Sequence, residues 1–210
     1  MLQAVTPVTV DGSESAAGVG EAERAAERRL VAAARADPRA FAPLYRAYVA
    51  PVYRYHYAHV RATQDAEDLT AATFGAALAS LGRYREQERF AAWLFTIARH
   101  ALIDFQRRQR RLGALTAPCG DDAGPTPLDA LIDRAPTPEA AAIRADEAAR
   151  LHRLLATLPV DQREAVTLRY FADLRPAEIG VVLARGDGAV RTLLHRALAR
   201  LRRAYREEDR

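Results

Sequence analysis

The chain has 210 residues, of which half are hydrophobic and 28% are charged. This balance is typical of a globular protein and excludes a disordered or fibrous one. The formal net charge is +4, and all 31 basic residues are arginine because the sequence contains no lysine. With so small an excess, the distribution of charge along the chain is more informative than its total.

One cysteine, Cys119, excludes an internal disulfide framework and any metal site built from several thiolates. No stretch approaches the roughly 18 consecutive apolar residues of a membrane span. The start of the chain lacks the basic residues and apolar core of a secretion signal. These absences predict a soluble protein of the cytoplasm with no membrane insertion.

Composition divides the chain into four parts, which are residues 1–36, 37–112, 113–146 and 147–206. Within the first part, residues 1–20 are small and polar and are expected to be disordered. Residues 21–36 are almost entirely Glu, Ala and Arg, a composition that favours an additional helix. The second and fourth parts have the apolar content of small folded domains.

The third part, residues 113–146, holds five of the eleven prolines. It also has six acidic residues against two arginines, which is a net charge of −4. Proline and aspartate at this density predict an extended, flexible and acidic linker. Because the apolar residues on both sides recur at helical spacing, we predict an all-α protein of two small helical domains joined by this linker.

The first domain is predicted to be built from helices joined by polar turns. The first of them has one apolar and aromatic face, and Pro51 should kink this helix or restart it. Asp65, three residues before Asp68, is expected to cap the next helix, which Gly82 ends. The polar segment 83–89 is expected to form a loop. A long helix follows, with the apolar stripe Phe90, Trp93, Leu94, Ile97, Ala101 and Phe105.

Aromatic and basic residues gather around this loop and at the end of the long helix, which carries Arg107, Arg108, Arg110 and Arg111. Single-stranded nucleic acid is held by aromatic stacking along a positively charged groove. Tyr84 and the loop arginines are the exposed candidates for that role. Trp93 is expected to belong to the hydrophobic core.

The second domain is predicted to contain a helix-turn-helix. Its first helix carries Leu151, Leu154, Leu155 and Leu158. Asp161 and Glu164 have the spacing of a capping box for the next helix. Pro176 is well placed as the first residue of a short helix, and the glycine-containing segment 186–188 is expected to turn into the last helix. A short helix, a turn with glycine and a longer basic helix form the helix-turn-helix arrangement.

The last helix is the most informative segment, because Asp187 is the only acidic residue between positions 185 and 206. Its outer face comprises Arg191, Thr192, His195, Arg196, Arg200, Arg202 and Arg203. Paired N–H donors of arginine fit phosphate oxygens or a guanine edge in the major groove. We expect the first four residues to read bases and the last three to contact the DNA backbone. A solvated amphipathic helix is the alternative.

An enzymatic function has little support in the sequence. His56 and His59 are spaced to share a helix face as metal ligands, but no third ligand is evident, and an ordinary mixed surface with the neighbouring tyrosines is expected. Nucleophile-elbow, P-loop and dinucleotide-binding patterns are absent. Cys119 lies in the acidic linker, where a thiolate is not favoured. We therefore expect no catalytic residue, metal or cofactor.

Several motifs taken together resemble a known family. In the first domain they are Phe41-x-x-Leu44-Tyr45-x-x-Tyr48-x-x-Pro51-Val52-Tyr53, Asp65-Ala66-Glu67-Asp68-Leu69-x-x-x-Thr73-Phe74, Phe90-x-x-Trp93-Leu94-x-x-Ile97-Ala98-Arg99 and Asp104-x-x-Arg107-Arg108. In the second they are Leu158-Pro159-x-x-Gln162-Arg163-Glu164, Leu168-Arg169-Tyr170, Ala177-Glu178-Ile179 and Leu194-His195-Arg196-Ala197-Leu198. In order and spacing these motifs are similar to the second and fourth domains of extracytoplasmic-function (ECF) sigma factors, over some two thirds of the chain.

This resemblance implies a bacterial initiation factor that binds core RNA polymerase and directs it to promoters. Its partners would be the clamp helices of the largest polymerase subunit, promoter DNA and an anti-sigma factor. The polymerase would perform the chemistry. The acidic linker would run toward the polymerase active-site cleft.

The resemblance also implies three sets of site residues. Contacts to the core polymerase would come from Asp65, Glu67, Asp68, Leu69 and Phe74. Binding and melting of the −10 element would involve Arg83, Tyr84, Arg85, Arg89, Arg99, His100, Arg107, Arg108 and Arg111. Recognition of the −35 element would involve Arg185, Arg191, Thr192, His195, Arg196 and Arg200.

The chain departs from the family pattern near the helix-turn-helix. Arg175 stands where Ser or Thr is usual, Arg185 replaces an apolar turn residue, Gly186 replaces a cap, and Leu193 replaces a basic residue. These changes affect the −35 sequence that would be read. A stand-alone helix-turn-helix repressor or activator, acting as a dimer, is the alternative function, although it would not need the domain at 37–112.

Overall fold

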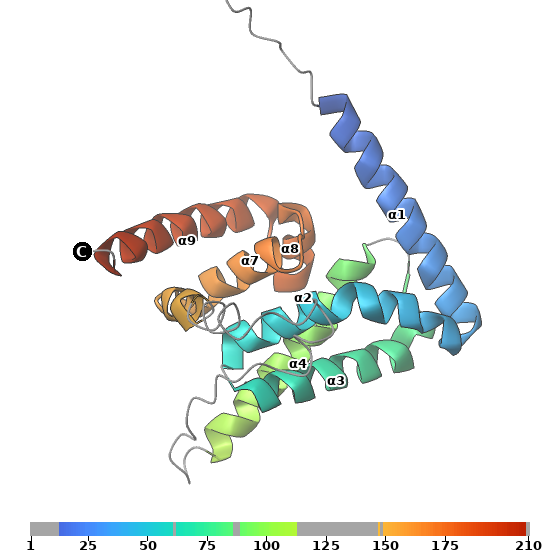
Figure 1. The fold of residues 1–210 in the computed structure, drawn as a ribbon, viewed down its shortest axis with the longest axis horizontal. Helices are drawn as coiled ribbons and strands as arrows, with labels where there is room; N and C mark the ends of the chain where they lie inside the picture. Colours follow the sequence, from blue (N-terminus) through green and yellow to red (C-terminus); the bar gives the residue numbers. More distant parts are fainter. Residues whose placement is uncertain (1–12, 61, 86–88, 113–146, 148, 209–210) are drawn as a thin grey trace, which may run out of the picture.

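The structure is a computed structural model that describes residues 13–60, 62–85, 89–112, 147 and 149–208, with side chains from residue 24 onward. Over these residues every regular element is helical and no strand is present, which confirms the all-α prediction. The elements are α1 (Ser13–Ala36), η1 (Pro38–Phe41), α2 (Ala42–Val60), α3 (Thr63–Ser80), η2 (Leu81–Arg83), α4 (Phe90–Leu112), α7 (Val160–Tyr170), α8 (Pro176–Leu183) and α9 (Asp187–Glu208), as Figure 1 shows. The linker at 113–146, with Cys119, lies outside the described residues.

Helix α1 begins at Ser13, so the prediction of disorder is wrong for the last eight residues of the segment 1–20. The C-terminal part of α1 is anchored, because Val31 and Ala34 are 1% and 2% exposed. Once an anchored turn exists, each further helix-forming residue adds a hydrogen bond at little cost. The N-terminal half of α1 therefore continues as helix while projecting away from the rest of the molecule (Figure 1).

Helix α2 runs through Pro51 without restarting, contrary to one of the two predicted outcomes. Proline removes one backbone hydrogen bond from a helix interior. Val49 and Val52 on either side of it are buried, and Val52 is fully inaccessible to solvent. The packing of this face against α3 and α4 outweighs the lost hydrogen bond.

Helix α3 begins at Thr63, two residues before its predicted cap. The residue at the N-cap position is Ala62, which makes no capping hydrogen bond with its side chain, so the predicted capping role of Asp65 is wrong. Asp65 instead lies in the first turn, where its carboxylate faces the positive end of the helix dipole. Gly82 falls in η2, directly after the end of α3 at Ser80.

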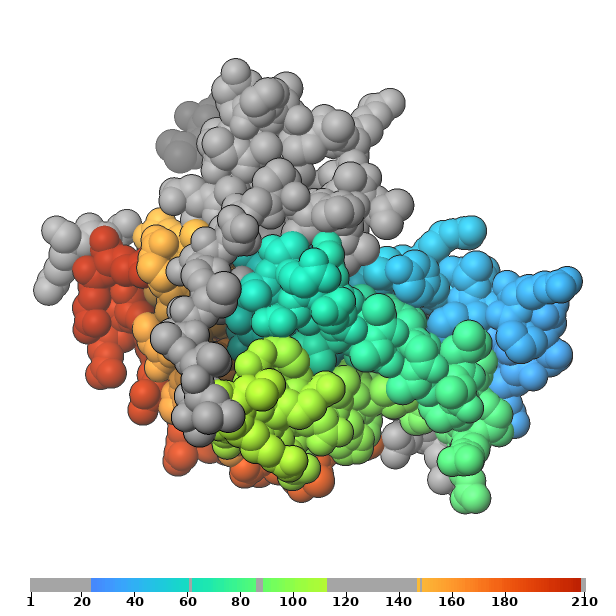
Figure 2. Space-filling view, turned by 90° about the horizontal axis from the view of Figure 1, so that it is seen from below, coloured from blue at the N-terminus to red at the C-terminus, as the bar shows by residue number. Residues whose placement is uncertain are grey.

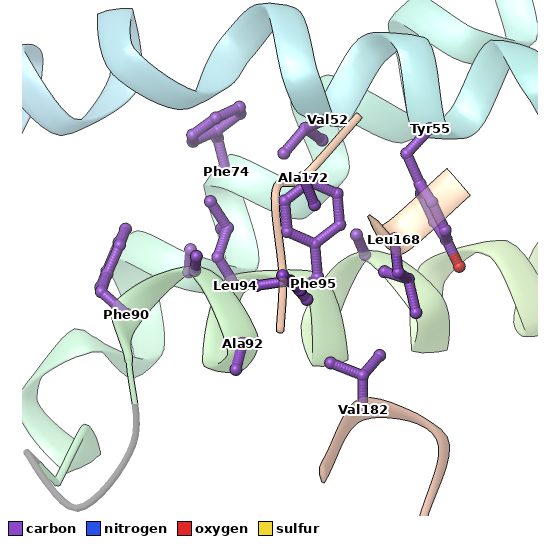
Figure 3. Close-up of a cluster of buried hydrophobic side chains, with 14 of the residues drawn as sticks. Val52, Tyr55, Phe74, Phe90, Ala92, Leu94, Phe95, Leu168, Ala172 and Val182 are labelled. Atoms are coloured by element: carbon purple, nitrogen blue, oxygen red, sulfur yellow. The ribbon is translucent and has the colours of Figure 1, made fainter. Parts of the chain in front are cut away.

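Helix α4 supplies the centre of the hydrophobic core, with Phe90, Leu94 and Phe95 at most 1% exposed. Phe95 meets the ring of Tyr55 from α2 edge-on, at a centroid distance of 5.5 Å. On the same helix, Val182 of α8 approaches from the opposite side to Val52 and Phe74 (Figure 3). Side chains from both halves of the chain thus belong to one core.

The C-terminal unit consists of helical residues 149–156 and helices α7, α8 and α9. Pro176 is the first residue of α8, as predicted. The predicted capping box of α7 is wrong, because its N-cap is Pro159 and no side chain caps the helix. Glu164, assigned to that box, is buried and turned toward the N-terminal unit, which comprises α1 to α4.

The two units pack directly against each other. Helix α8 lies on α4, and α7 contacts α2. In Figure 2 the orange and red C-terminal helices border α2 and α4 along one side, while the blue α1 lies at the opposite end. A second cluster joins Ala58 of α2 to Leu155, Leu158, Val166 and Ala197 of the C-terminal unit. No local pattern in the sequence predicts this contact between the units.

His56 and His59 do not lie on a mixed surface as expected. His56 is fully buried, and its Nε2 lies 3.0 Å from the hydroxyl of Thr73. Because that hydroxyl donates its proton to the Leu69 carbonyl at 2.7 Å, it can only accept from His56. The Nδ1 atom of His56 is buried without a partner, so burial lowers the pKa of His56 to about 3.

His59 is held in a similar way at the contact with the C-terminal unit. Its Nδ1 donates to the Tyr55 carbonyl at 2.7 Å, and its Nε2 is buried without a partner. Burial, with smaller contributions from Arg163 and His152, lowers the pKa of His59 to about 4. No group of His, Cys, Asp and Glu side chains in the described part of the chain is arranged to hold a metal ion.

These histidines predict that acid destabilises the protein. Both bind a proton more readily in the unfolded chain, so the free energy of unfolding falls as the pH drops below about 6.5. Between pH 7 and pH 5 each histidine should cost about 1–2 kcal/mol. Urea unfolding at several pH values measures this loss.

His56→Gln isolates the effect, because the amide can still donate to Thr73 but cannot gain a proton. The variant should lose less stability on acidification than the unmodified chain. His100→Gln, which removes an exposed histidine from α4, is the matched control and should follow the unmodified chain. An equal acid sensitivity in all three proteins would contradict the assignment to His56.

Candidate nucleic-acid and polymerase interface

The geometry of the helix-turn-helix depends on a tight turn between α8 and α9. Ala184 adopts a left-handed conformation with φ of 52°, and the Arg185 N–H donates to the Gly180 carbonyl at 2.9 Å. A Cβ added at Gly180 would lie 2.6 Å from the Arg185 carbonyl oxygen, so only glycine fits there without a backbone shift. The turn is complete before Asp187, which begins α9. The predicted turn over 186–188 therefore lies too far toward the C-terminus.

Helix α9 has a buried side and an exposed basic side. Val190 and Ala197 are on the buried side and are fully inaccessible to solvent. All six side chains that were assigned to the −35 element are exposed, namely Arg185, Arg191, Thr192, His195, Arg196 and Arg200. A row of this kind presents N–H donors at a helix surface, which is the chemistry that DNA phosphates and base edges accept.

Three of these residues have intramolecular partners. Arg191 pairs with Asp187 one turn earlier at 2.7 Å, and the Thr192 hydroxyl donates to the Gly188 carbonyl at 3.0 Å. Arg185 pairs with Asp161 at the start of α7. The two ion pairs are well exposed, so each contributes at most about 1 kcal/mol and can be exchanged for a DNA contact.

The residues assigned to the −10 element do not all share one environment. Arg83, Arg85, His100, Arg107, Arg108 and Arg111 are exposed. The expectation that Tyr84 is exposed is wrong, because it is 5% exposed and packs on Phe90 and Trp93 with centroid distances of 5.8 and 5.1 Å. Aromatic packing at the start of α4 is more favourable than leaving this ring in water. Tyr84 thus supports the base of the loop.

Arg89 and Arg99 lie at the contact between the two units. The Nε of Arg99 donates to both carboxylate oxygens of Glu164, each at 3.2 Å. The Nη1 of Arg89 lies 3.7 Å from Glu178 and donates to the Asp173 carbonyl at 3.3 Å. Both arginines are therefore occupied by the C-terminal unit in this structure.

Glu164 is the acidic partner with the greatest burial, with a side chain 6% exposed. Burial raises the pKa of this carboxyl, and the guanidinium of Arg99 opposes that shift. The role of Glu164 could not be found from the sequence, because its partner lies 65 positions away. The spacing of Glu164 from Asp161 predicted a helix cap, so there was no reason to expect a contact with Arg99 from the sequence.

The residues assigned to the core polymerase divide into surface and core. Asp65, Glu67 and Asp68 lie on the first turns of α3 with solvent access, and Gln64 donates to Asp68 at 3.3 Å. Burial and the neighbouring Asp68 raise the pKa of Asp65. Leu69 and Phe74 are only 3% and 6% exposed, so in this structure they support α3 from within and do not offer a surface to a partner.

Comparisons with known proteins agree with this arrangement. The model of sigma-70 region 2 matches residues 44–112, and that of sigma-70 region 4 matches residues 148–201. The chain is 40% identical over 137 residues to the ECF RNA polymerase sigma factor ShbA of Streptomyces griseus, covering 65% of this chain and 69% of ShbA. It is 37% identical over 174 residues to the ECF sigma factor BldN of Streptomyces coelicolor, covering 81% of this chain and 62% of BldN.

Solved structures show the same fold. The structure of CnrH in complex with the cytosolic domain of CnrY has a TM-score of 0.64 at 24% identity, covering 88% of this chain and 99% of that chain. The sigma factor RpoE of Bartonella quintana, crystallised with the anti-sigma factor NepR, has a TM-score of 0.61 at 18% identity, covering 79% and 96%.

The fold and the two matched regions define an RNA polymerase sigma factor, a DNA-binding protein of transcription initiation. Specifically, the chain belongs to the ECF family of sigma factors. Its function is promoter-specific transcription initiation, which sets aside the stand-alone repressor. No helix in the described part of the chain is long and apolar enough to cross a membrane.

The strained turn of the helix-turn-helix generates a stability prediction. Ala184→Gly should raise the free energy of unfolding by about 0.5–1 kcal/mol, because glycine adopts the left-handed conformation without the steric cost of a Cβ. Ala184 is exposed, so no buried contact is lost. Chemical denaturation measures the change.

Ala189→Gly is the control, since this residue is also exposed but lies inside α9. It should lower stability by about 0.5–1 kcal/mol. A destabilised Ala184→Gly variant would show that the turn is not strained as described.

Proposed function

We propose that the C-terminal unit reads the −35 element through the exposed face of α9. The observation that carries this assignment is the row of exposed basic side chains on the second helix of a helix-turn-helix. Arg191, Thr192, His195 and Arg196 lie on the first half of α9, where a recognition helix meets base edges. Arg185 and Arg200 flank them and would contact phosphates.

For the N-terminal unit we propose binding to the −10 element and assistance in its melting. The exposed arginines of this surface are Arg83, Arg85, Arg107, Arg108 and Arg111, with His100 on the same helix as the last three. They would contact phosphates of the opened strand. Arg89 and Arg99 would join them when the C-terminal unit moves away. Tyr84 would position the loop from below, since its ring is packed in the core.

The acidic start of α3 is our candidate contact to core RNA polymerase. Asp65, Glu67 and Asp68 present negative charge at the surface, and a partner with basic side chains would complement it. Leu69 and Phe74 would act indirectly by holding α3 in place. We assign residues 37–112 and 147–206 as the two functional domains and 113–146 as the acidic linker.

The remaining parts of the proposal concern partners and location. An anti-sigma factor is expected to restrain this protein, as the anti-sigma factor NepR is bound to RpoE in its crystal. We further propose that the chain acts in the cytoplasm, uses no cofactor and performs no chemistry of its own. The polymerase would supply the catalysis.

Arginine substitutions on α9 test the reading face. Arg191→Ala and Arg196→Ala should each weaken transcription that depends on the −35 element by about 1–3 kcal/mol equivalent, because each removes a base contact. In vitro transcription with core polymerase, on templates selected from genomic fragments by the unmodified protein, measures the loss.

The matched control is Arg206→Ala, an exposed arginine in the last turn of the same helix. It should leave template choice unchanged. If Arg191→Ala and Arg196→Ala select the same templates with the same strength as the control, the reading face lies elsewhere.

A second experiment tests the polymerase contact. A triple variant with Asp65→Asn, Glu67→Gln and Asp68→Asn should co-elute less with core RNA polymerase in gel filtration, and the difference should shrink at high salt because ion screening weakens the unmodified contact. The control neutralises Asp104 and Glu207, two exposed acidic residues outside α3. Equal co-elution of the triple variant and the control would contradict the α3 assignment.

A further inference from the structure

The face of α4 that contacts the C-terminal unit is apolar at its centre. Ala92 and Phe95 on α4 are at most 1% exposed, and Val182 and Ala172 of the C-terminal unit are 3% and 6% exposed. Figure 3 shows these side chains from the two halves of the chain close together. The contact is a packed interface and not a chance approach of two surfaces.

At the edge of this interface, acidic residues of the C-terminal unit meet arginines of the N-terminal unit. Arg99 and Glu164 have side chains 27% and 6% exposed, and Arg89 and Glu178 have side chains 24% and 18% exposed. Arg107, in contrast, is 67% exposed at the far end of α4. The two arginines nearest the C-terminal unit are thus the ones that carboxylates cover.

A carboxylate and a phosphate offer an arginine the same recognition, since both present negatively charged oxygens to its N–H donors. We propose that the C-terminal unit competes with the −10 strand for α4, with Glu164 and Glu178 taking the place of phosphates on Arg99 and Arg89. The proposal rests on the proposed role of α4 in −10 binding. It assigns a function to two glutamates that the DNA contacts do not use.

Closure leaves the other DNA face open. Arg191 and Arg196 of α9 remain exposed, whereas Val190 and Ala197 form the buried side of that helix. The closed chain can therefore offer α9 to a duplex while Arg89 and Arg99 are paired with the C-terminal unit. Binding of the two promoter elements is made unequal by the fold itself.

The covalent connection does not impose closure. Residues 113–146 could span on the order of 100 Å if extended, so the two units are free to separate. Tethering at this length gives an effective concentration in the millimolar range. A modest interface is then sufficient to keep the units together, and a polymerase that binds them separately can open it.

The test uses the full chain with Glu164→Gln and Glu178→Gln together. Glutamine keeps the capping hydrogen bond from the Arg175 N–H, which Glu178 accepts at 2.7 Å, while removing the charge. X-ray scattering measures the radius of gyration. Fluorescence anisotropy measures binding to a labelled pool of single-stranded 12-mers of random sequence.

We expect the double variant to expand and to bind the single strands about tenfold more tightly, which is the gain when a closed state favoured ten to one is removed. Asp104→Asn together with Glu207→Gln is the control, since it also removes two negative charges, both from exposed positions. It should remain compact and gain little. If the double variant is as compact and binds as weakly as the control, the proposal is wrong.

A charge exchange tests the pair independently of any loss of folding. Glu164→Arg alone should open the chain, and adding Arg99→Glu should restore the compact state by re-forming the pair in reverse. Failure of this restoration in a helical, folded protein would contradict the role of the pair. Expansion of the double glutamine variant without tighter binding would support closure but contradict the proposed role of Arg89 and Arg99 in −10 binding.

Discussion

Helix α4 is buried on two sides, and most of the structure depends on this. Its residues Leu94 and Leu102 are at most 1% exposed, and the helix packs against α2 and α3 on one side and α8 on the other. A helix with so wide an apolar surface cannot be stable alone in water. The N-terminal unit satisfies part of that surface, and the C-terminal unit covers a further part. The same helix carries basic side chains, so its packing also decides which of them reach solvent.

The chemistry of arginine explains why one side chain can serve both states. A guanidinium remains charged under all physiological conditions and presents several fixed donors, so it needs an anionic or carbonyl partner wherever water is excluded. At the contact between the units Arg99 finds that partner in Glu164. Along the exposed end of α4, Arg107 pairs with Asp104 one turn earlier, at 3.6 Å. Such an exposed pair contributes little and does not hold the side chain.

Much of the fold could be predicted from local pattern. Helical spacing of apolar residues, the start of α8 at Pro176 and the basic outer face of α9 are properties of short segments, and the structure agrees with each. The errors concern residues with two possible uses. Asp65 and Glu164 have the spacing of helix caps, yet neither caps a helix. The spacing of a capping pattern can be recognised from a few neighbouring residues. The group that the carboxylate finally contacts depends on segments far away in the chain.

Tyr84 and His56 show the same limit from the other direction. Both have polar groups that permit a surface position, which the neighbouring arginines favoured for Tyr84 and the neighbouring tyrosines favoured for His56. In the structure Tyr84 fills the space beside Phe90, and His56 is buried with a single hydrogen bond to Thr73. Whether a semi-polar ring is buried depends on the shape of the cavity that the other helices leave. That shape cannot be predicted from a local sequence pattern, because it results from the packing of several helices.

The sequence by itself determined the helical class, the two-unit organisation and the exposed arginines of α9, because periodicity, proline content and charge act over a few residues. The tertiary structure alone decided that the two units meet across α4, that Glu164 lies opposite Arg99 and that His56 of α2 is buried. These features depend on contacts between residues far apart in the chain. Their free energy depends on apolar burial and on the balance between charge desolvation and ion pairing, and both exist only once the helices have packed.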